Sequence, residues 1–261
     1  MNPLRLLLGL LCGPALAMAT MPMGAAQAAA PAEGLNQCKP PAPGRYALLG
    51  SGSQGSEPVA VLMQEHWLPG GRVEGVRYLR QGRRFSEDRY SGSIKTGNDC
   101  WVSIERRGPS GVMLSGDTLN QQGRPTASLI TRPDGVLSLR YVNQGENSCS
   151  PAQLNGLVTS QQQGQSWQQG RWLANAVVQR EWWHKGQVNG IALSSYGGRI
   201  ERAPYSGTLS LSSDCLGTMR QRDSQGVAYN YKVLLLSRGG GYVYLQTDPN
   251  DLTLGLLQHQ H

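Results

Sequence analysis

The sequence predicts an all-β protein made of two tandem, small, antiparallel meander β-barrels, each with one disulfide. Three observations predict this class: an internal duplication, a composition that favours strands and turns, and four cysteines at matched positions. The chain has 261 residues, of which 34 are Gly, 15 are Pro and 16% are charged. Glycine and proline punctuate short apolar runs, which is typical of strands joined by turns and not of long helices.

The first thirty residues are typical of an export signal. Arg5 supplies a positive start, an apolar stretch follows it, and small residues fill positions 25–30, so we expect cleavage after Ala28 or Ala30. A retained membrane anchor is the alternative, but glycine and proline interrupt the apolar run, and a spanning helix needs about twenty apolar residues. We expect Cys12 to leave with the signal. The mature chain is then secreted or periplasmic, with no transmembrane segment.

The mature chain is a duplication. Residues 90–112 align without a gap onto residues 205–227, and the same register places Leu119 on Leu234, Leu137 on Leu252 and Leu139 on Leu254. Such a repeat is long enough to close its own core, so we predict a signal peptide (1–30), a first β-barrel repeat (31–148) and a second one (149–261).

Four cysteines remain after the signal: Cys38, Cys100, Cys149 and Cys215. Cys100 and Cys215 occupy one aligned position, while Cys38 and Cys149 open the two copies. The duplication therefore selects the pairs Cys38–Cys100 and Cys149–Cys215 among three connectivities, each stabilising a domain by about 3–5 kcal/mol. Metal binding is the alternative, but no CxxC pair or neighbouring histidine completes a zinc site.

Alternation within residues 205–212 predicts a strand with one buried face. Short turns connect it to further strands, and each copy reaches seven or eight. Closure into a barrel removes exposed strand edges, although one larger barrel or sandwich shared by both copies is the rival. The polar segment 160–170 is interpreted as an enlarged loop.

A resemblance supports the barrel. Residues 205–218 (Tyr-Ser-Gly-Thr-Leu-Ser-Leu-Ser-Ser-Asp-Cys-Leu-Gly-Thr), followed by Asp-Ser-Gln-Gly-Val (223–227) and Leu-Gln-Thr-Asp-Pro (245–249), resemble small exported bacterial calycin-like domains of the lipocalin-like or allene-oxide-cyclase type. The first copy matches in part, with Trp101-Val102 where that pattern has x-Gly. The resemblance implies a calycin-like barrel and leaves function open, because such barrels host binders, inhibitors and isomerases.

Candidate site residues come from the matched copies. Glu65 and Trp67, like Glu181 and Trp183, stand at alternate strand positions and so share a face. If that face lines the barrel, each carboxylate lies beside an indole and its pKa rises unless an arginine pairs with it. Outward-facing rim positions or structural ion pairs are the alternative. The aligned tyrosines Tyr90 and Tyr205 complete the proposed ligand-binding set.

Other chemistry has weak support in the sequence. His66 and His184 are not matched between the copies, and the C-terminal tail that carries His259 and His261 is expected to be mobile. We therefore predict no catalytic triad and no metal site. No phosphate loop or nucleic-acid module occurs, and no cofactor is predicted. The net charge of +7 comes from scattered arginines, which suit either anionic partners or a plain basic surface.

Three functions follow. The first is a non-enzymatic binding protein of the envelope or exterior that holds a small lipophilic or glycan ligand in barrel cavities. The second is a protein-interaction or protease-inhibitor module with an envelope partner. The third is an isomerase or cyclase in which Glu65 or Glu181 acts as acid or base.

Overall fold

The computed structural model describes residues 38–97, 99–132, 135–145, 148–196, 198–236 and 240–259. The predicted signal peptide with Cys12, and the terminal His261, lie outside the described residues, as does the side chain of His259.

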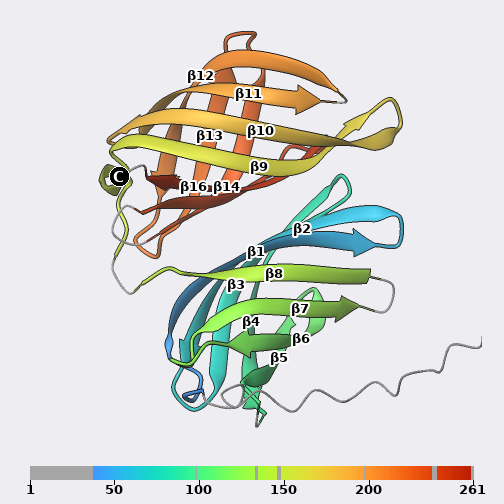
Figure 1. Ribbon diagram of the computed structural model, residues 1–261, viewed down its shortest axis with the longest axis vertical. Coiled ribbons are helices and arrows are strands. Elements are labelled where there is room, and N and C mark those ends of the chain that lie inside the picture. Colours follow the sequence, from blue (N-terminus) through green and yellow to red (C-terminus); the bar gives the residue numbers. More distant parts are fainter. Residues whose placement is uncertain are drawn as a thin grey trace, which may run out of the picture. The chain divides into compact units, whose positions relative to one another are not determined.

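Barrel 1 is a closed meander of eight antiparallel strands (Figure 1). Its strands are β1 (Gly44–Gln54), β2 (Glu57–Leu68), β3 (Arg72–Gln81), β4 (Arg84–Thr96), β5 (Trp101–Gly108), β6 (Gly111–Leu119), β7 (Pro125–Arg132) and β8 (Gly135–Asn143). Strand β8 returns to pair with β1, with Leu49 opposite Arg140, so closure leaves no free sheet edge. Inward side chains form one apolar core that includes Leu48, Val61 and Ile104.

Barrel 2 repeats this topology after a short 3-10 turn, η1 (Pro151–Gln153). Its strands are β9 (Gly156–Gln168), β10 (Arg171–His184), β11 (Gln187–Tyr196), β12 (Arg199–Leu211), β13 (Leu216–Asp223), β14 (Ala228–Leu235), β15 (Gly241–Gln246) and β16 (Asp251–His259). The predicted fold class, two tandem antiparallel barrels, is confirmed. The described part of the chain contains no helix long and apolar enough to cross a membrane.

Two sequence expectations are wrong. The first is the loop predicted at residues 160–170, because β9 runs to Gln168 and pairs with both β10 and β16. Its glutamines alternate between the two faces of the barrel wall: Gln162 is buried and Gln161 is exposed. The segment has the polar composition of a loop because the interior of barrel 2 is itself polar at this end.

The second wrong expectation is the alignment of the two copies over their last three strands. Between β5 and β6 four residues separate Arg107 from its partner Val112, whereas between β13 and β14 five separate Arg222 from Ala228. From there on the copies match at an offset of 116: Leu119 corresponds to Leu235 and not to Leu234. Leu137 and Leu139 likewise correspond to Thr253 and Gly255, not to Leu252 and Leu254. A slip of one residue exchanges the two faces of a strand.

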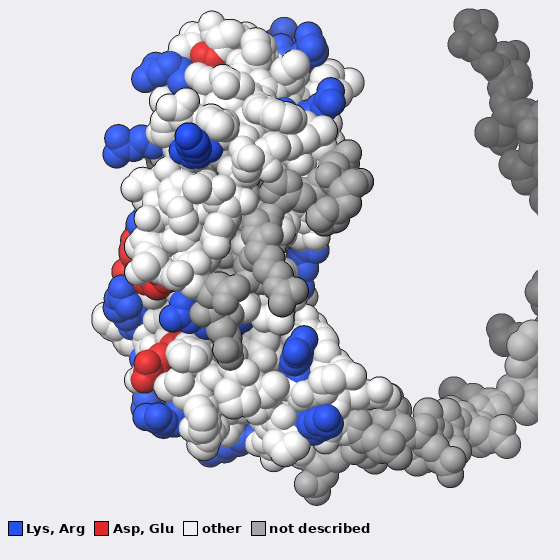
Figure 2. Space-filling model, turned by 90° about the vertical axis from the view of Figure 1, so that its left-hand side faces the viewer, with Lys and Arg blue, Asp and Glu red and all other residues white. Residues whose placement is uncertain are grey.

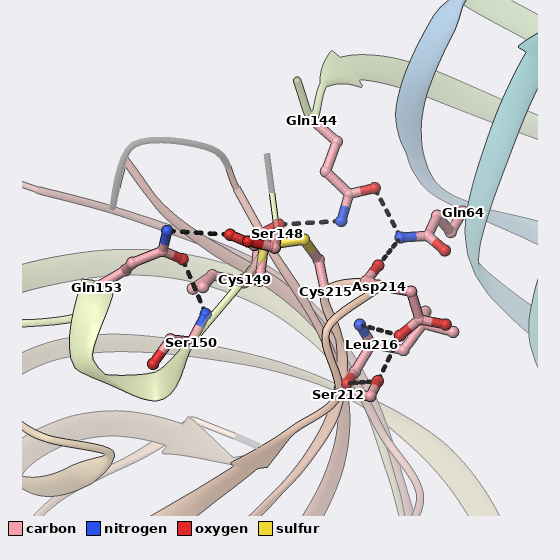
Figure 3. Close-up of a disulfide and its surroundings, with 11 residues drawn as sticks. Gln64, Gln144, Ser148, Cys149, Ser150, Gln153, Ser212, Asp214, Cys215 and Leu216 are labelled. Atoms are coloured by element: carbon pink, nitrogen blue, oxygen red, sulfur yellow. Dashed lines mark hydrogen bonds between the residues drawn. A yellow bond between two sulfur atoms is a disulfide. The ribbon is translucent and has the colours of Figure 1, made fainter. Parts of the chain in front are cut away.

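Both predicted disulfides are present. Cys38 is bonded to Cys100 with a Cα–Cα distance of 5.6 Å, and Cys149 to Cys215 with one of 4.9 Å. Cys100 and Cys215 have positive φ angles, 63° and 72°, at matched turns. In the second turn Asp214 accepts a bond from the Leu216 N–H, which agrees with the turn-forming role expected of this aspartate (Figure 3).

A third apolar cluster lies between the barrels. From barrel 1 it contains residues on the outer face of β1, β2 and β3: Ala47, Leu49, Ala60, Leu62, Val76 and Tyr78. From barrel 2 it contains Leu234 of β14, Leu236 just after β14, Val243 and Leu245 of β15, and Leu252 of β16. Beside it, Gln64 Nε2 donates to the Asp214 carbonyl at 2.6 Å and to Gln144 Oε1 at 2.9 Å (Figure 3). Gln144 Nε2 donates to the Leu235 carbonyl at 3.0 Å. The barrels therefore share an interface that has an apolar part and a hydrogen-bonded part.

Candidate functional site

The six predicted site residues all face the barrel interiors and meet in two clusters. In barrel 1, Trp67 Nε1 donates to Glu65 Oε2 at 3.0 Å and the Tyr90 hydroxyl donates to Glu65 Oε1 at 2.7 Å. Glu65 is 0% exposed. The outward-facing alternative is therefore wrong for this pair.

A glycine fits each tyrosine into its cluster. Gly75 stands beneath the Tyr90 ring on the neighbouring strand, where an added Cβ would come within 2.5 Å of Tyr90 Cζ. Gly190 does the same beneath Tyr205. The matched Val-x-Gly of the two copies thus has a packing role, because only a residue without a side chain leaves room for the ring.

Barrel 1 adds residues that the sequence analysis missed. Arg106 Nε donates to Glu65 Oε1 at 2.5 Å, and its Nη2 lies 3.4 Å from Asp117 Oδ2. The Tyr141 hydroxyl makes a short bond to the same Asp117 oxygen. Arg106 is 1% exposed and Asp117 is 0% exposed, so a cation and two carboxylates share a dry interior. The alignment of the two copies does not mark Arg106, because Gln221 stands at the matched position, but Arg106 alternates with the buried Ile104 on β5 and so faces the barrel interior.

The ion pair between Arg106 and Glu65 affects the pKa values of the buried carboxyl groups. Burial alone would raise the pKa of the Glu65 carboxyl, but the adjacent Arg106 charge and the bonds from Arg106, Trp67 and Tyr90 together lower it below the ordinary value. Burial raises the pKa of Asp117 in spite of Arg106. Barrel 1 therefore holds a structural ion-pair network, one of the alternatives for Glu65.

Barrel 2 keeps the carboxylate and changes its partners. Glu181, 0% exposed, accepts bonds from Trp183 Nε1 (2.8 Å) and Tyr205 (2.7 Å). It also accepts from Gln221 Nε2 at 3.1 Å and the Tyr242 hydroxyl at 2.6 Å. Gln221 stands where barrel 1 has Arg106. Burial raises the pKa of the Glu181 carboxyl, and the four hydrogen bonds only partly offset it.

Above Glu181, barrel 2 opens into a pocket of about 40 Å³. Tyr205 and Gln221 line it and also contact Glu181, so they form a layer between the pocket and the buried carboxylate. The remaining lining is mostly tyrosine and glutamine: Gln162, Val177, Gln179, Ser194, Tyr196, Ala203, Asp223, Tyr229, Tyr231, Gln246 and Thr253. A volume of this size admits one or two small polar groups, not a whole sugar ring.

Two buried acceptors at this end of the barrel have no hydrogen-bond partner among the described residues. They are Gln162 Oε1, on a pocket-lining side chain that is 6% exposed, and Asn175 Oδ1, on a residue that is 5% exposed. An unsatisfied buried acceptor costs about 1–3 kcal/mol, so a group that donates to it is favoured here.

The same end of barrel 1 is filled with apolar side chains and with a buried ion pair between Arg77 and Asp88 (2.6 Å), whose barrel 2 counterparts are Ala192 and Ala203. The barrel 1 counterparts of Gln179 and Gln246 are Met63 and Ile130, and both are 0% exposed. Gly50 replaces Gln162, and the Cβ of a larger residue would meet the backbone of β8. The copies therefore differ in chemistry: apolar side chains and buried ion pairs fill barrel 1, and barrel 2 has a polar mouth.

Other candidates do not gather into a site. His66 and His184 are exposed on outer faces, as expected. Among the described residues no group of three or more His, Cys, Asp or Glu is placed to hold a metal ion. A larger hollow of about 340 Å³ lies on the outer wall of barrel 1, bordered by Trp101, Leu114 and Leu129, each about half exposed. Lysines and arginines are dispersed over the face seen in Figure 2 and form no single basic patch.

The fold and the two clusters define a tandem eight-stranded barrel protein with unlike interiors. Neither known protein-family patterns nor curated proteins match the chain. Three solved structures are similar at low level: a proposed AttH from Nitrosomonas europaea (11% identity, TM-score 0.26, 82% of this chain and 91% of that chain), kievitone hydratase from Nectria haematococca (8%, 0.26, 87% and 92%) and a porin-like protein from Bacteroides uniformis (10%, 0.22, 87% and 99%). At these scores the similarities carry no functional argument.

Proposed function

We propose that this protein is an exported binding protein in which barrel 2 holds part of a small polar ligand and barrel 1 is structural. The observation that carries the proposal is the unpartnered Gln162 Oε1 in the wall of the barrel 2 pocket. The tyrosine and glutamine lining favours a hydroxylated, glycan-like ligand over the lipophilic one that was the other expectation. The two disulfides support an exported location.

The pocket volume limits what enters. About 40 Å³ accepts one edge of a ligand, such as a hydroxyl pair, while the rest stays at the mouth beside Tyr196 and Tyr229. Membership of the calycin-like class stays a prediction. So does catalysis, and the geometry gives it little support: Glu181 is saturated by four donors and reaches the pocket only through Tyr205 and Gln221.

Side-chain amide signals in NMR spectra test the proposal. Glycerol and glucose, titrated into the mature protein, are expected to shift the amide signals of Gln162, Gln179 and Gln221. Gln162→Leu should weaken binding about tenfold, because one buried hydrogen bond is lost. Gln161→Leu, on the outer face of the same strand, is the matched control and should change nothing. Shifts spread over outer-face residues, or equal effects of both variants, would place binding elsewhere.

A second candidate, protein interaction, is favoured by an apolar outer face of barrel 2. Val178, Ile191 and Leu193 are each more than 40% exposed, as is the neighbouring Trp182. Their barrel 1 counterparts Leu62, Val76 and Tyr78 pack into the interface between the barrels. We infer that this face takes a second copy of the chain. Sedimentation velocity should then show concentration-dependent association that Ile191→Lys abolishes; a monomer at every concentration would refute it.

A further inference from the structure

The barrel 2 pocket has a charge opposite to that of the whole chain. Among the described residues that line it, Asp223 is the single charged one, and none is a lysine, arginine or histidine. The buried carboxylate of Glu181 lies behind Tyr205 and Gln221. The chain as a whole carries a formal charge of +7, so the basic surface does not indicate what this pocket accepts.

Three polar side chains of the pocket wall keep an acceptor oxygen after donating a hydrogen to a neighbour. The Tyr205 hydroxyl donates to Glu181 and the Tyr229 hydroxyl donates to Asp223 at 3.0 Å, so each leaves an oxygen lone pair free to accept. Gln221 Nε2 donates one amide hydrogen to Glu181. Gln162 Nε2 donates to Gln179 Oε1 at 3.2 Å, which leaves Gln162 Oε1 as an unpartnered acceptor. A ligand group that carries several donors can therefore bond to each of these three oxygens.

Four tyrosine rings complete the lining: Tyr196, Tyr205, Tyr229 and Tyr231. Ring faces attract a cation, and the attraction increases on desolvation. Burial and the neighbouring carboxylate Asp223 raise the pKa of the Tyr229 hydroxyl, in agreement with a negative field at the mouth.

We propose that the group this pocket receives is a protonated amine, held by Asp223, the tyrosine rings and the free oxygen of Gln162. An alkylammonium group has three N–H donors and no acceptor, carries the complementary charge, and is small enough for a pocket of about 40 Å³. The inference rests on the proposed binding function and names the ligand class as organic amines, amino sugars among them.

The test compares three probes of similar size by NMR titration of the mature protein at low salt: ethanolammonium, ethylene glycol and glycolate. We expect ethanolammonium to bind at least about tenfold more tightly than ethylene glycol, and glycolate not to bind. Asp223→Asn keeps the turn acceptor Oδ1 and should weaken the amine about tenfold, and by much more than it weakens the glycol. Tyr229→Phe keeps the ring and should retain the amine, whereas Tyr229→Leu should lose it several-fold.

The outcomes separate the two proposals. If glycol and amine bind equally and both shift the Gln162 amide, the ammonium assignment is wrong and the binding function stands. If none of the three probes shifts the signal of any pocket residue, and glycerol and glucose do not either, the proposed function fails and this inference fails with it. Tighter binding of glycolate would reverse the predicted charge preference.

Discussion

Arg106 and Gln221 occupy equivalent positions on β5 and β13, and both donate to the carboxylate of a buried glutamate, but only Arg106 brings a positive charge. This one difference explains why the pKa of Glu65 is lowered and that of Glu181 raised in otherwise matched clusters. As a result, Glu65 of barrel 1 lies in an ion pair, whereas Glu181 of barrel 2 is held by neutral hydrogen-bond donors.

Arg106→Gln should destabilise barrel 1 by about 3–5 kcal/mol, because it leaves Glu65 and Asp117 buried without their cation. The double variant Glu65→Gln/Arg106→Gln should recover part of this loss, since it removes the uncompensated carboxylate. Urea unfolding with intact disulfides measures both. A double variant no more stable than Arg106→Gln would show that the pair is not coupled.

The two glutamates should give opposite pH dependences. Folded Glu181 holds its proton more tightly than the unfolded chain, so its stabilising contribution is full below the ordinary pKa of 4.5 and declines as the pH rises above it. Folded Glu65 releases its proton more easily, so its contribution is present above 4.5 and is lost as the pH falls through its lowered pKa.

Unfolding free energies between about pH 2 and pH 7 check this, each against the corresponding Glu→Gln variant so that other groups cancel. The advantage of wild type over Glu181→Gln should decrease with rising pH, and that over Glu65→Gln should increase. Parallel slopes for the two comparisons would contradict the assignment of charge states.

Gly190→Ala should close the barrel 2 pocket by displacing Tyr205, because the new Cβ would stand 2.5 Å from the ring carbon Cζ. Overpacking of this kind costs about 1–3 kcal/mol. Gly116→Ala is the matched control, in a strand of barrel 1 with no heavy atom within 4 Å of the new methyl group. Thermal unfolding should separate the two, and glycol or amine binding should weaken only in Gly190→Ala.

Removal of the Cys149–Cys215 disulfide should loosen the junction between the barrels as well as barrel 2. The Cys215 carbonyl accepts from Leu235 N–H, and the adjacent Asp214 and Leu235 carbonyls accept from Gln64 and Gln144. We expect Cys149→Ala/Cys215→Ala to cost about 2–5 kcal/mol and to split unfolding into two steps. Cys38→Ala/Cys100→Ala is the control, and a split of equal size there would place the coupling elsewhere.

The paired Glu–Trp sites could be found from sequence because the duplication marks positions that both copies retain. Arg106, Asp117 and Gln162 could not be found in this way, since each occurs in one copy only. Gln162 also stands in a run of glutamines that looks like a loop until its neighbours on β10 and β16 are known. The shifted register was hidden by three consecutive leucines, 234–236, because a leucine is available on either face.

The extra residue in the hairpin before β14 has a consequence for how this protein tolerates change. Deleting it would turn Asn230 and Lys232 toward the barrel core and send Tyr231 outward, which would remove Tyr231 from the pocket wall. The length of this hairpin is therefore constrained more strongly than the identity of its exposed residues.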